Sequence, residues 1–205
     1  METRSAPQMI DLRKFPATLI LIITNVLIFI LETLAGGSTK NTVAISFGAQ
    51  ATPFLEMGEY WRLFTAMFLH FGIVHLGCNM LSLYGLGPAI ERIYGRPRYV
   101  TIYILSGLAG NLATWAVELR TGDYALSAGA SGAIFGIIGA YLALFLVPSM
   151  RSRLSAKSLL IMLGINLAYG LSTPGVNMTA HIGGLIAGAA VAAVMIFVIR
   201  QKQKR

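Results

Sequence analysis

Long apolar runs constrain this chain more than any other feature. Six such runs, separated by polar stretches, cover about 18–35, 71–90, 99–117, 131–147, 158–171 and 179–199. A helix needs about 20 apolar residues to cross a bilayer, and only 12% of the 205 residues are charged, well below the share in soluble domains. We therefore expect an all-α membrane protein: one domain over residues 1–205, built as a six-transmembrane-helix bundle with a short polar tail at 1–14 and a basic tail at 200–205.

The positions of the basic residues predict the orientation. If both termini lie on one side of the membrane, that side receives 13 of the 16 Lys and Arg residues, and the other side receives Lys40, Arg62 and Arg120. The positive-inside rule then places both termini in the cytoplasm, with the chain in the plasma membrane, or in the inner membrane of a Gram-negative cell. The net charge of +8 is explained by this rule without a nucleic-acid partner. The sequence does not predict an oligomeric state.

Three of the expected spans then run from outside to inside and carry polar residues in their outer turns. These residues are His75 and Asn79 in the second span, Ser131 in the fourth and His181 in the sixth. Polar side chains are costly in a membrane and usually face the bundle interior or a water-filled cavity. We expect these four side chains to lie at similar depth inside the bundle.

Ser131 lies among small residues, between Gly129 and Gly132, and its hydroxyl could be a helix cap or a nucleophile. Gly184 and Gly188 follow His181 on one helix face and form a track of small residues that allows close helix packing. Gly132 begins a matching track after Ser131. Close packing of these two helices would bring nucleophile and base within hydrogen-bond distance.

No Asp or Glu follows Asp123, so no acid from the last three spans can orient His181. The sequence favours a Ser–His dyad in which Phe135, one turn after Ser131, packs against the imidazole. His75 and Asn79 lie four residues apart and could donate hydrogen bonds to an oxyanion, although Asn79 could equally bond between helices. His70 would face about 140° away from His75 if both were helical, and we expect it to point elsewhere.

Two connections are expected to surround the site. The first, residues 36–62, ends in an amphipathic segment in which Trp61 and Arg62 would anchor the loop at the membrane interface. The second, residues 172–176, is short, contains Pro174 and Gly175, and would form a movable cap over the site.

Taken together, the motifs resemble those of the rhomboid intramembrane serine proteases. Members of that family carry Trp-Arg in the first loop, His-x4-His-x3-Asn in the second span, Gly-x-Ser-Gly opening the fourth and Ala-His-x-Gly-Gly opening the sixth. The corresponding residues here are Trp61-Arg62, His70, His75 and Asn79, Gly129 to Gly132, and Ala180 to Gly184. The resemblance covers residues 18–199. Phe135 stands where the family often has tyrosine, and Glu91 matches a position that we interpret as structural.

The resemblance implies a serine endopeptidase that cleaves single-pass membrane proteins near the outer end of their transmembrane helix, without a cofactor or metal. Ser131 would be the nucleophile and His181 the base, and His75, Asn79 and the Ser131 amide would form the oxyanion hole. Two alternatives are a catalytically inactive relative that binds membrane proteins and a membrane transporter. The presence of both Ser131 and His181 argues against the first, and the lack of an acid in the middle of a span argues against the second.

Overall fold

The structure is a computed structural model, and it describes residues 10–173 and 176–203. Over these residues the chain is helical, with one isolated antiparallel bridge between Gln50 and Ser127. The elements in chain order are η1 (Leu12–Lys14), α1 (Pro16–Leu34), α2 (Asn41–Phe47), α3 (Thr52–Glu56), α4 (Arg62–Thr65), η2 (Ala66–Phe68), α5 (Ile73–Tyr94), α6 (Arg96–Thr121), α7 (Ser131–Phe145), α8 (Pro148–Arg151), α9 (Ala156–Ser172) and α10 (Met178–Gln203).

Helices α1, α5, α6, α7, α9 and α10 fall where the six apolar runs predict them, with ends shifted by a few residues. Four of them, α1, α5, α6 and α10, are long and apolar enough to cross a membrane, and α7 and α9 are shorter apolar helices. Large apolar side chains such as Ile20, Leu27 and Phe197 are exposed on the outside of the bundle. Hydrocarbon, unlike water, would cover such a surface at no cost. The fold is that of an all-helical membrane protein.

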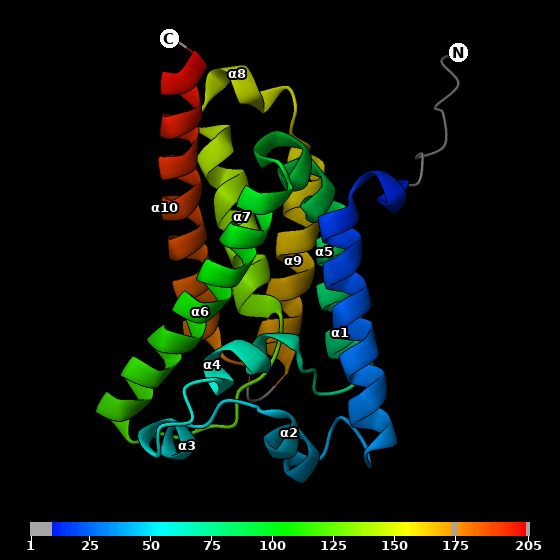
Figure 1. The fold of residues 1–205 in the computed structure, drawn as a ribbon, viewed down its shortest axis with the longest axis vertical. Helices are drawn as coiled ribbons and strands as arrows, with labels where there is room; N and C mark the ends of the chain where they lie inside the picture. The colour runs from blue at the N-terminus through cyan, green and yellow to red at the C-terminus, as the bar shows by residue number, and fades with distance from the viewer. Residues whose placement is uncertain (1–9, 174–175, 204–205) are drawn as a thin grey trace.

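Helix α7 forms the centre of the bundle, between α5, α6, α9 and α10, and α1 packs on the outer side of α5 (Figure 1). Every residue of α7 from Gly132 to Tyr141 is buried. Small residues make this position possible. A Cβ atom on Gly184 of α10 would overlap the carbonyl oxygen of Gly132, and one on Gly188 would overlap that of Gly136. The two small-residue tracks therefore pack backbone against backbone, as the sequence predicts.

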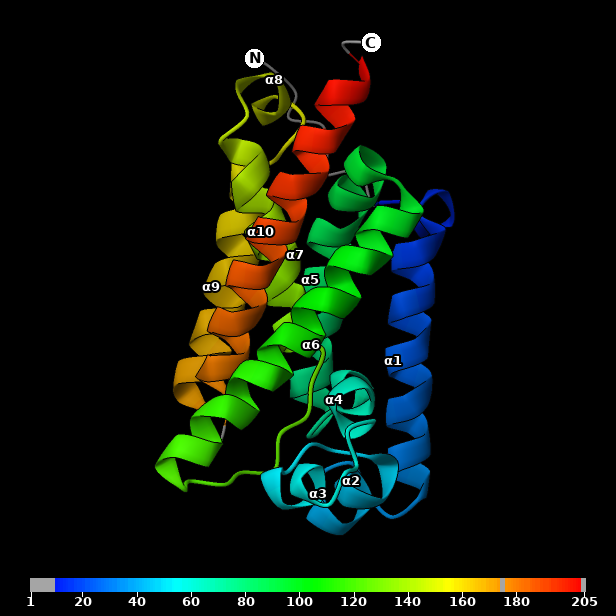
Figure 2. The same cartoon turned by 60° about the vertical axis from the view of Figure 1, so that its left-hand side comes forward.

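The two ends of the bundle differ. Helix α1 begins and α10 ends at the end that carries α8, and the segment from α2 to α4 covers the opposite end (Figures 1 and 2). The bridge between Gln50 and Ser127 joins this covering segment to the connection that precedes α7. At 1.5 Å per residue the 15 residues of α7 span about 22 Å, against about 39 Å for the 26 residues of α6. Ser131 therefore begins a helix much shorter than its neighbour.

We predict that Gly184→Ala destabilises the protein, because the added methyl group would overlap the Gly132 carbonyl and push α7 and α10 apart. Overpacking of this kind costs about 1–3 kcal/mol. Gly164→Ala is the matched control, since a Cβ atom on this glycine of α9 meets nothing within 4 Å. Thermal unfolding in detergent should show a lower midpoint for Gly184→Ala and no loss for Gly164→Ala; equal midpoints would contradict the packing argument.

Candidate active site

Ser131 and His181 lie next to each other where the small-residue tracks of α7 and α10 begin. Ser131 is the first residue of α7, His181 lies in the first turn of α10, and Oγ of Ser131 is 2.9 Å from Nε2 of His181. Asn177 fixes the start of α10, because its side-chain oxygen accepts the Ala180 amide at 2.9 Å. The structure thus holds a hydroxyl and an imidazole from two helices at hydrogen-bond distance.

The imidazole of His181 is held by packing. The ring of Phe135 is stacked on it, with centroids 4.2 Å apart and planes at 12°. His181 is 4% exposed, and within the described part of the chain its Nδ1 has no hydrogen-bond partner. Among the described residues, an aromatic ring and not a carboxylate therefore contacts this imidazole.

His75 and Ser131 line the same cavity, on either side of Gly129. Gly129 has φ +144° and a Cβ atom there would lie 2.8 Å from Cε1 of His75 and 3.6 Å from Oγ of Ser131. The amide of Gly129 donates to the Ala66 carbonyl at 2.8 Å, which fixes the approach of the chain to α7. Gly129 therefore allows the His75 ring and the Ser131 hydroxyl to come together.

Asn79 follows His75 by one turn of α5 and is 1% exposed. Its Nδ2 has no acceptor among the described residues. A buried amide donor normally has a partner, so this Nδ2 is available to donate to water or to a bound group. Asn79 does not line the cavity next to Ser131.

A cavity of about 360 Å³ opens at this point. Its lining includes Ser131 and His75 together with polar side chains from three other segments: Asn41, Ser127 and Asn177. Such a lining can hold water next to the Ser131 hydroxyl inside an otherwise apolar bundle. Of the expected cap at residues 172–176, Thr173 and Val176 line the cavity, whereas Pro174 and Gly175 lie outside the described residues.

The expectation that His70 points away from His75 is wrong. Their ring centroids are 5.0 Å apart in an edge-on arrangement. The helical angle does not apply because α5 begins only at Ile73, after Gly72 with φ +88°. The buried carboxylate of Glu32 in α1 accepts the His70 backbone amide at 3.2 Å and helps to hold this turn.

The sequence did not predict a role for Tyr169 at the site. It lies in α9, lines the cavity, and stacks on the His75 ring with centroids 5.4 Å apart and planes at 18°. The His75 ring is therefore enclosed by Tyr169, His70 and Gly129. A tyrosine in the last turn of an apolar helix was the only signal that could have indicated this contact.

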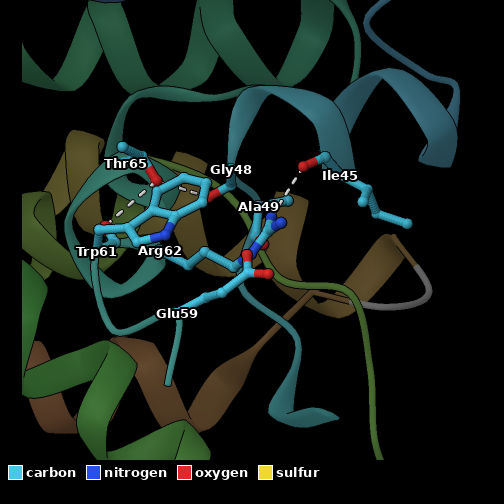
Figure 3. A network of polar contacts seen from close by, with 7 residues as sticks. All are labelled: Ile45, Gly48, Ala49, Glu59, Trp61, Arg62 and Thr65. Carbon is cyan, nitrogen blue, oxygen red and sulfur yellow. Dashed lines mark hydrogen bonds and ion pairs between the residues drawn. The ribbon is translucent and has the colours of Figure 1, made fainter. Parts of the chain in front are cut away.

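The interface role expected for Arg62 is also wrong. Arg62 is 5% exposed, and Nη1 donates to the carbonyl groups of Ile45 and Ala49 at 2.8 and 3.1 Å, while Nε donates to Glu59 at 2.7 Å (Figure 3). The guanidinium ties the covering segment together from within. Trp61 remains 51% exposed, as an interfacial aromatic residue would be.

Glu91 lies far from this site and contacts α1. Its carboxylate oxygens accept the backbone amides of Ala17 and Thr18 at 3.1 and 2.8 Å, and the Thr18 hydroxyl at 2.8 Å. The carboxylate thereby satisfies amide groups that are unpaired at the start of α1.

Fold and site together define a helical membrane protein with a buried Ser–His pair beside a polar cavity. The family model described as the rhomboid domain matches residues 57–197, and the chain belongs to the rhomboid family.

Similarity to individual proteins supports this family assignment. The chain is 38% identical to rhomboid protease GluP of Bacillus subtilis over 87% of its own length, and 30% identical to rhomboid protease AarA of Providencia stuartii over 88%. It is 42% identical to RHOMBOID-like protein 6, mitochondrial, of Arabidopsis thaliana over 65%. The chain spans 34% of the length of the Bacillus protein, 73% of the Providencia protein and 43% of the Arabidopsis protein.

Proposed function

We propose that this protein is an intramembrane serine endopeptidase that cleaves single-pass membrane proteins near the outer end of their transmembrane helix. The observation that carries the proposal is the 2.9 Å separation of Ser131 Oγ and His181 Nε2 beside a polar cavity in an apolar bundle. Membership of the rhomboid family and similarity to two relatives named as rhomboid proteases support it.

In this mechanism His181 Nε2 accepts the Ser131 proton while Oγ attacks the scissile carbonyl carbon. The resulting oxyanion accepts hydrogen bonds from the Ser131 amide, from His75 and from Nδ2 of Asn79. His181 then gives its proton to the leaving amine, which departs. Water from the cavity attacks the acyl-enzyme in the same way and releases the second product. Phe135 holds the imidazole in place throughout, the role that an acid has in a triad.

We further propose that α1, α5, α6, α7, α9 and α10 all cross the membrane, with both termini in the cytoplasm. The active site then lies near the outer leaflet, on the side covered by α2 to α4. A helical peptide bond is inaccessible to a nucleophile, so the outer turns of the substrate must unwind, which helix-destabilising residues favour. Cleavage is expected next to a small residue.

The test is incubation of the purified protein in detergent with a panel of single-pass substrates, followed by mass spectrometry of the products. We expect a cut in the outer part of the substrate span, or just outside it. A helix-breaking residue a few positions below the cut should speed cleavage, and one at the cytoplasmic end should not. A cut in the cytoplasmic half would contradict the orientation or the site, and binding without any cleavage would favour an inactive membrane-protein-binding relative.

Asn79→Ala should slow cleavage by roughly 100- to 1,000-fold without abolishing it, because one oxyanion donor is lost while the others remain. The thermal midpoint should hardly change, since Nδ2 of Asn79 has no partner among the described residues. Asn166→Ala is the control. This buried asparagine of α9 donates to Ser82 Oγ at 2.6 Å, so its loss should lower the midpoint and leave kcat nearly unchanged. The reverse pattern would make Asn79 a helix contact only.

Tyr169 is proposed to position His75 through the stacked contact. Tyr169→Ala should lower kcat about ten-fold with little change in KM, since an aromatic pair contributes about 0.5–1.5 kcal/mol. Tyr169→Phe keeps the ring and should retain nearly full kcat. Steady-state kinetics on one substrate checks both. Equal kcat values for the two variants, or a change confined to KM, would remove the positioning role.

A further inference from the structure

A second cavity lies at the opposite end of the bundle, where α1 begins. Its volume is about 550 Å³, and its lining comes from Lys14 and Phe15 before α1, Glu91 and Arg92 in the last turn of α5, and Arg96 at the start of α6. Nothing in the proposed proteolytic mechanism uses these residues. The cavity is therefore a separate feature of the molecule.

Its charge balance is strongly positive. Three cations, Lys14, Arg92 and Arg96, line the cavity, and Glu91 is the acid in its lining. Both oxygens of Glu91 are already engaged by backbone and hydroxyl groups of α1. Arg96 lies 3.8 Å from that carboxylate with its side chain 69% exposed, a separation at which an ion pair contributes little. The cations are thus left to bind another anion.

Two further features of the cavity favour an anion: a restrained arginine side chain and the N-terminus of a helix. The guanidinium of Arg92 lies over the Phe15 ring, 5.1 Å from its centroid, and this contact restrains a long side chain. Helix α6 begins here after Gly95, with no side-chain cap and no acid in its first turn. The positive end of a 26-residue helix therefore adds to the field of the three cations.

The position of the cavity identifies the kind of anion. It opens where two apolar helices begin, which is the depth of the cytoplasmic lipid headgroups in the proposed membrane arrangement, and α1 carries exposed Ile20 and Ile23 in its first turns. Acyl chains can lie along such a face. Basic pockets between transmembrane helices at the cytoplasmic surface are suited to anionic phosphate headgroups.

We propose that this cavity binds the phosphate group of an anionic phospholipid, held by Lys14, Arg92 and Arg96. The same chemistry would accept free inorganic phosphate, but only a lipid also contacts the apolar face of α1. Binding at the junction of α1, α5 and α6 would stabilise their packing, since a ligand that binds the folded state alone raises its stability.

The test uses the purified protein in a neutral detergent. Thermal unfolding is followed with added phosphatidylglycerol, with phosphatidylcholine of the same acyl chains, or with inorganic phosphate at the same concentration. We expect phosphatidylglycerol alone to raise the midpoint. An equal shift from phosphatidylcholine would overturn the anion site, and an equal shift from inorganic phosphate would overturn the lipid as its occupant.

Variants of the cavity residues test whether the lipid binds there. Native mass spectrometry counts the bound lipids and gives the affinity of each variant. Removing one surface cation weakens anionic-lipid binding by about five-fold, so Arg92→Gln with Arg96→Gln should weaken it by about 25-fold. Arg153→Gln changes an exposed arginine two residues after α8, and α8 lies at this end of the bundle; this variant is the control and should keep wild-type affinity. If the double variant does not fold, Lys14→Gln at an exposed position should still give the five-fold loss. Unchanged affinity in the folded cavity variants, or an equal loss in Arg153→Gln, would overturn the site.

Discussion

Ser131→Ala should abolish cleavage of every substrate, with a loss in kcat of roughly 10⁴- to 10⁶-fold. The proposed nucleophile is removed, and alanine fits the first position of α7 because the segment around it is already built from small residues. His181→Ala should fall to a similar level, since the base and the nucleophile act as one unit. The double variant should then be no slower than either single variant. Product formation by gel and mass spectrometry measures all three.

The thermal midpoint is the control for these variants. It should stay close to that of the wild type for Ser131→Ala, whose side chain makes one polar contact, to His181. Cleavage above background in a folded Ser131→Ala protein would rule out Ser131 as the nucleophile. Additive losses in the double variant would mean that the two residues act in separate steps.

Gly129→Ala should also cause a large loss, roughly 100- to 1,000-fold in kcat. Its backbone φ of +144° disfavours any side chain, and the methyl group would lie 2.8 Å from Cε1 and 2.9 Å from Nε2 of His75. The imidazole would have to move away from the oxyanion position, at a cost comparable to losing one oxyanion donor.

Gly122→Ala separates the two causes. Gly122 lies in the same connection between α6 and α7 and also has positive φ, +76°, but a Cβ atom there meets nothing within 4 Å. It should lower stability slightly and leave kcat near the wild-type value. If both variants lost kcat equally, backbone strain would explain the effect and the contact with His75 would not matter.

Hydropathy was sufficient to predict the six main helices because an apolar segment without water around it must satisfy its own backbone hydrogen bonds, and a helix does so. The close approach of α7 and α10 was also predictable, since Gly132, Gly184 and Gly188 follow a spacing that only a helix face uses. The 2.9 Å contact between Ser131 and His181 is a consequence of that approach.

Non-helical turns and buried charges were not predictable from periodicity. His70 precedes the start of α5, so its orientation depends on Gly72 and on the Glu32 carboxylate, which is distant in sequence. Arg62 follows an exposed tryptophan and matches an interfacial pattern, yet it is buried because the carbonyl groups of Ile45 and Ala49 converge on it. The contact of Tyr169 with His75 likewise depends on how α9 packs against α5.

Labelling with a fluorophosphonate probe tests the central claim most directly, because this reagent forms a covalent bond to an activated serine oxygen as fluoride leaves. Peptide mapping by mass spectrometry should find one adduct, on Ser131. The adduct should be absent in Ser131→Ala and strongly reduced in His181→Ala, in which the hydroxyl has lost its base. An adduct on another serine, or an unlabelled Ser131 in a preparation that cleaves its substrate, would contradict the assignment of Ser131 and His181 as the catalytic pair.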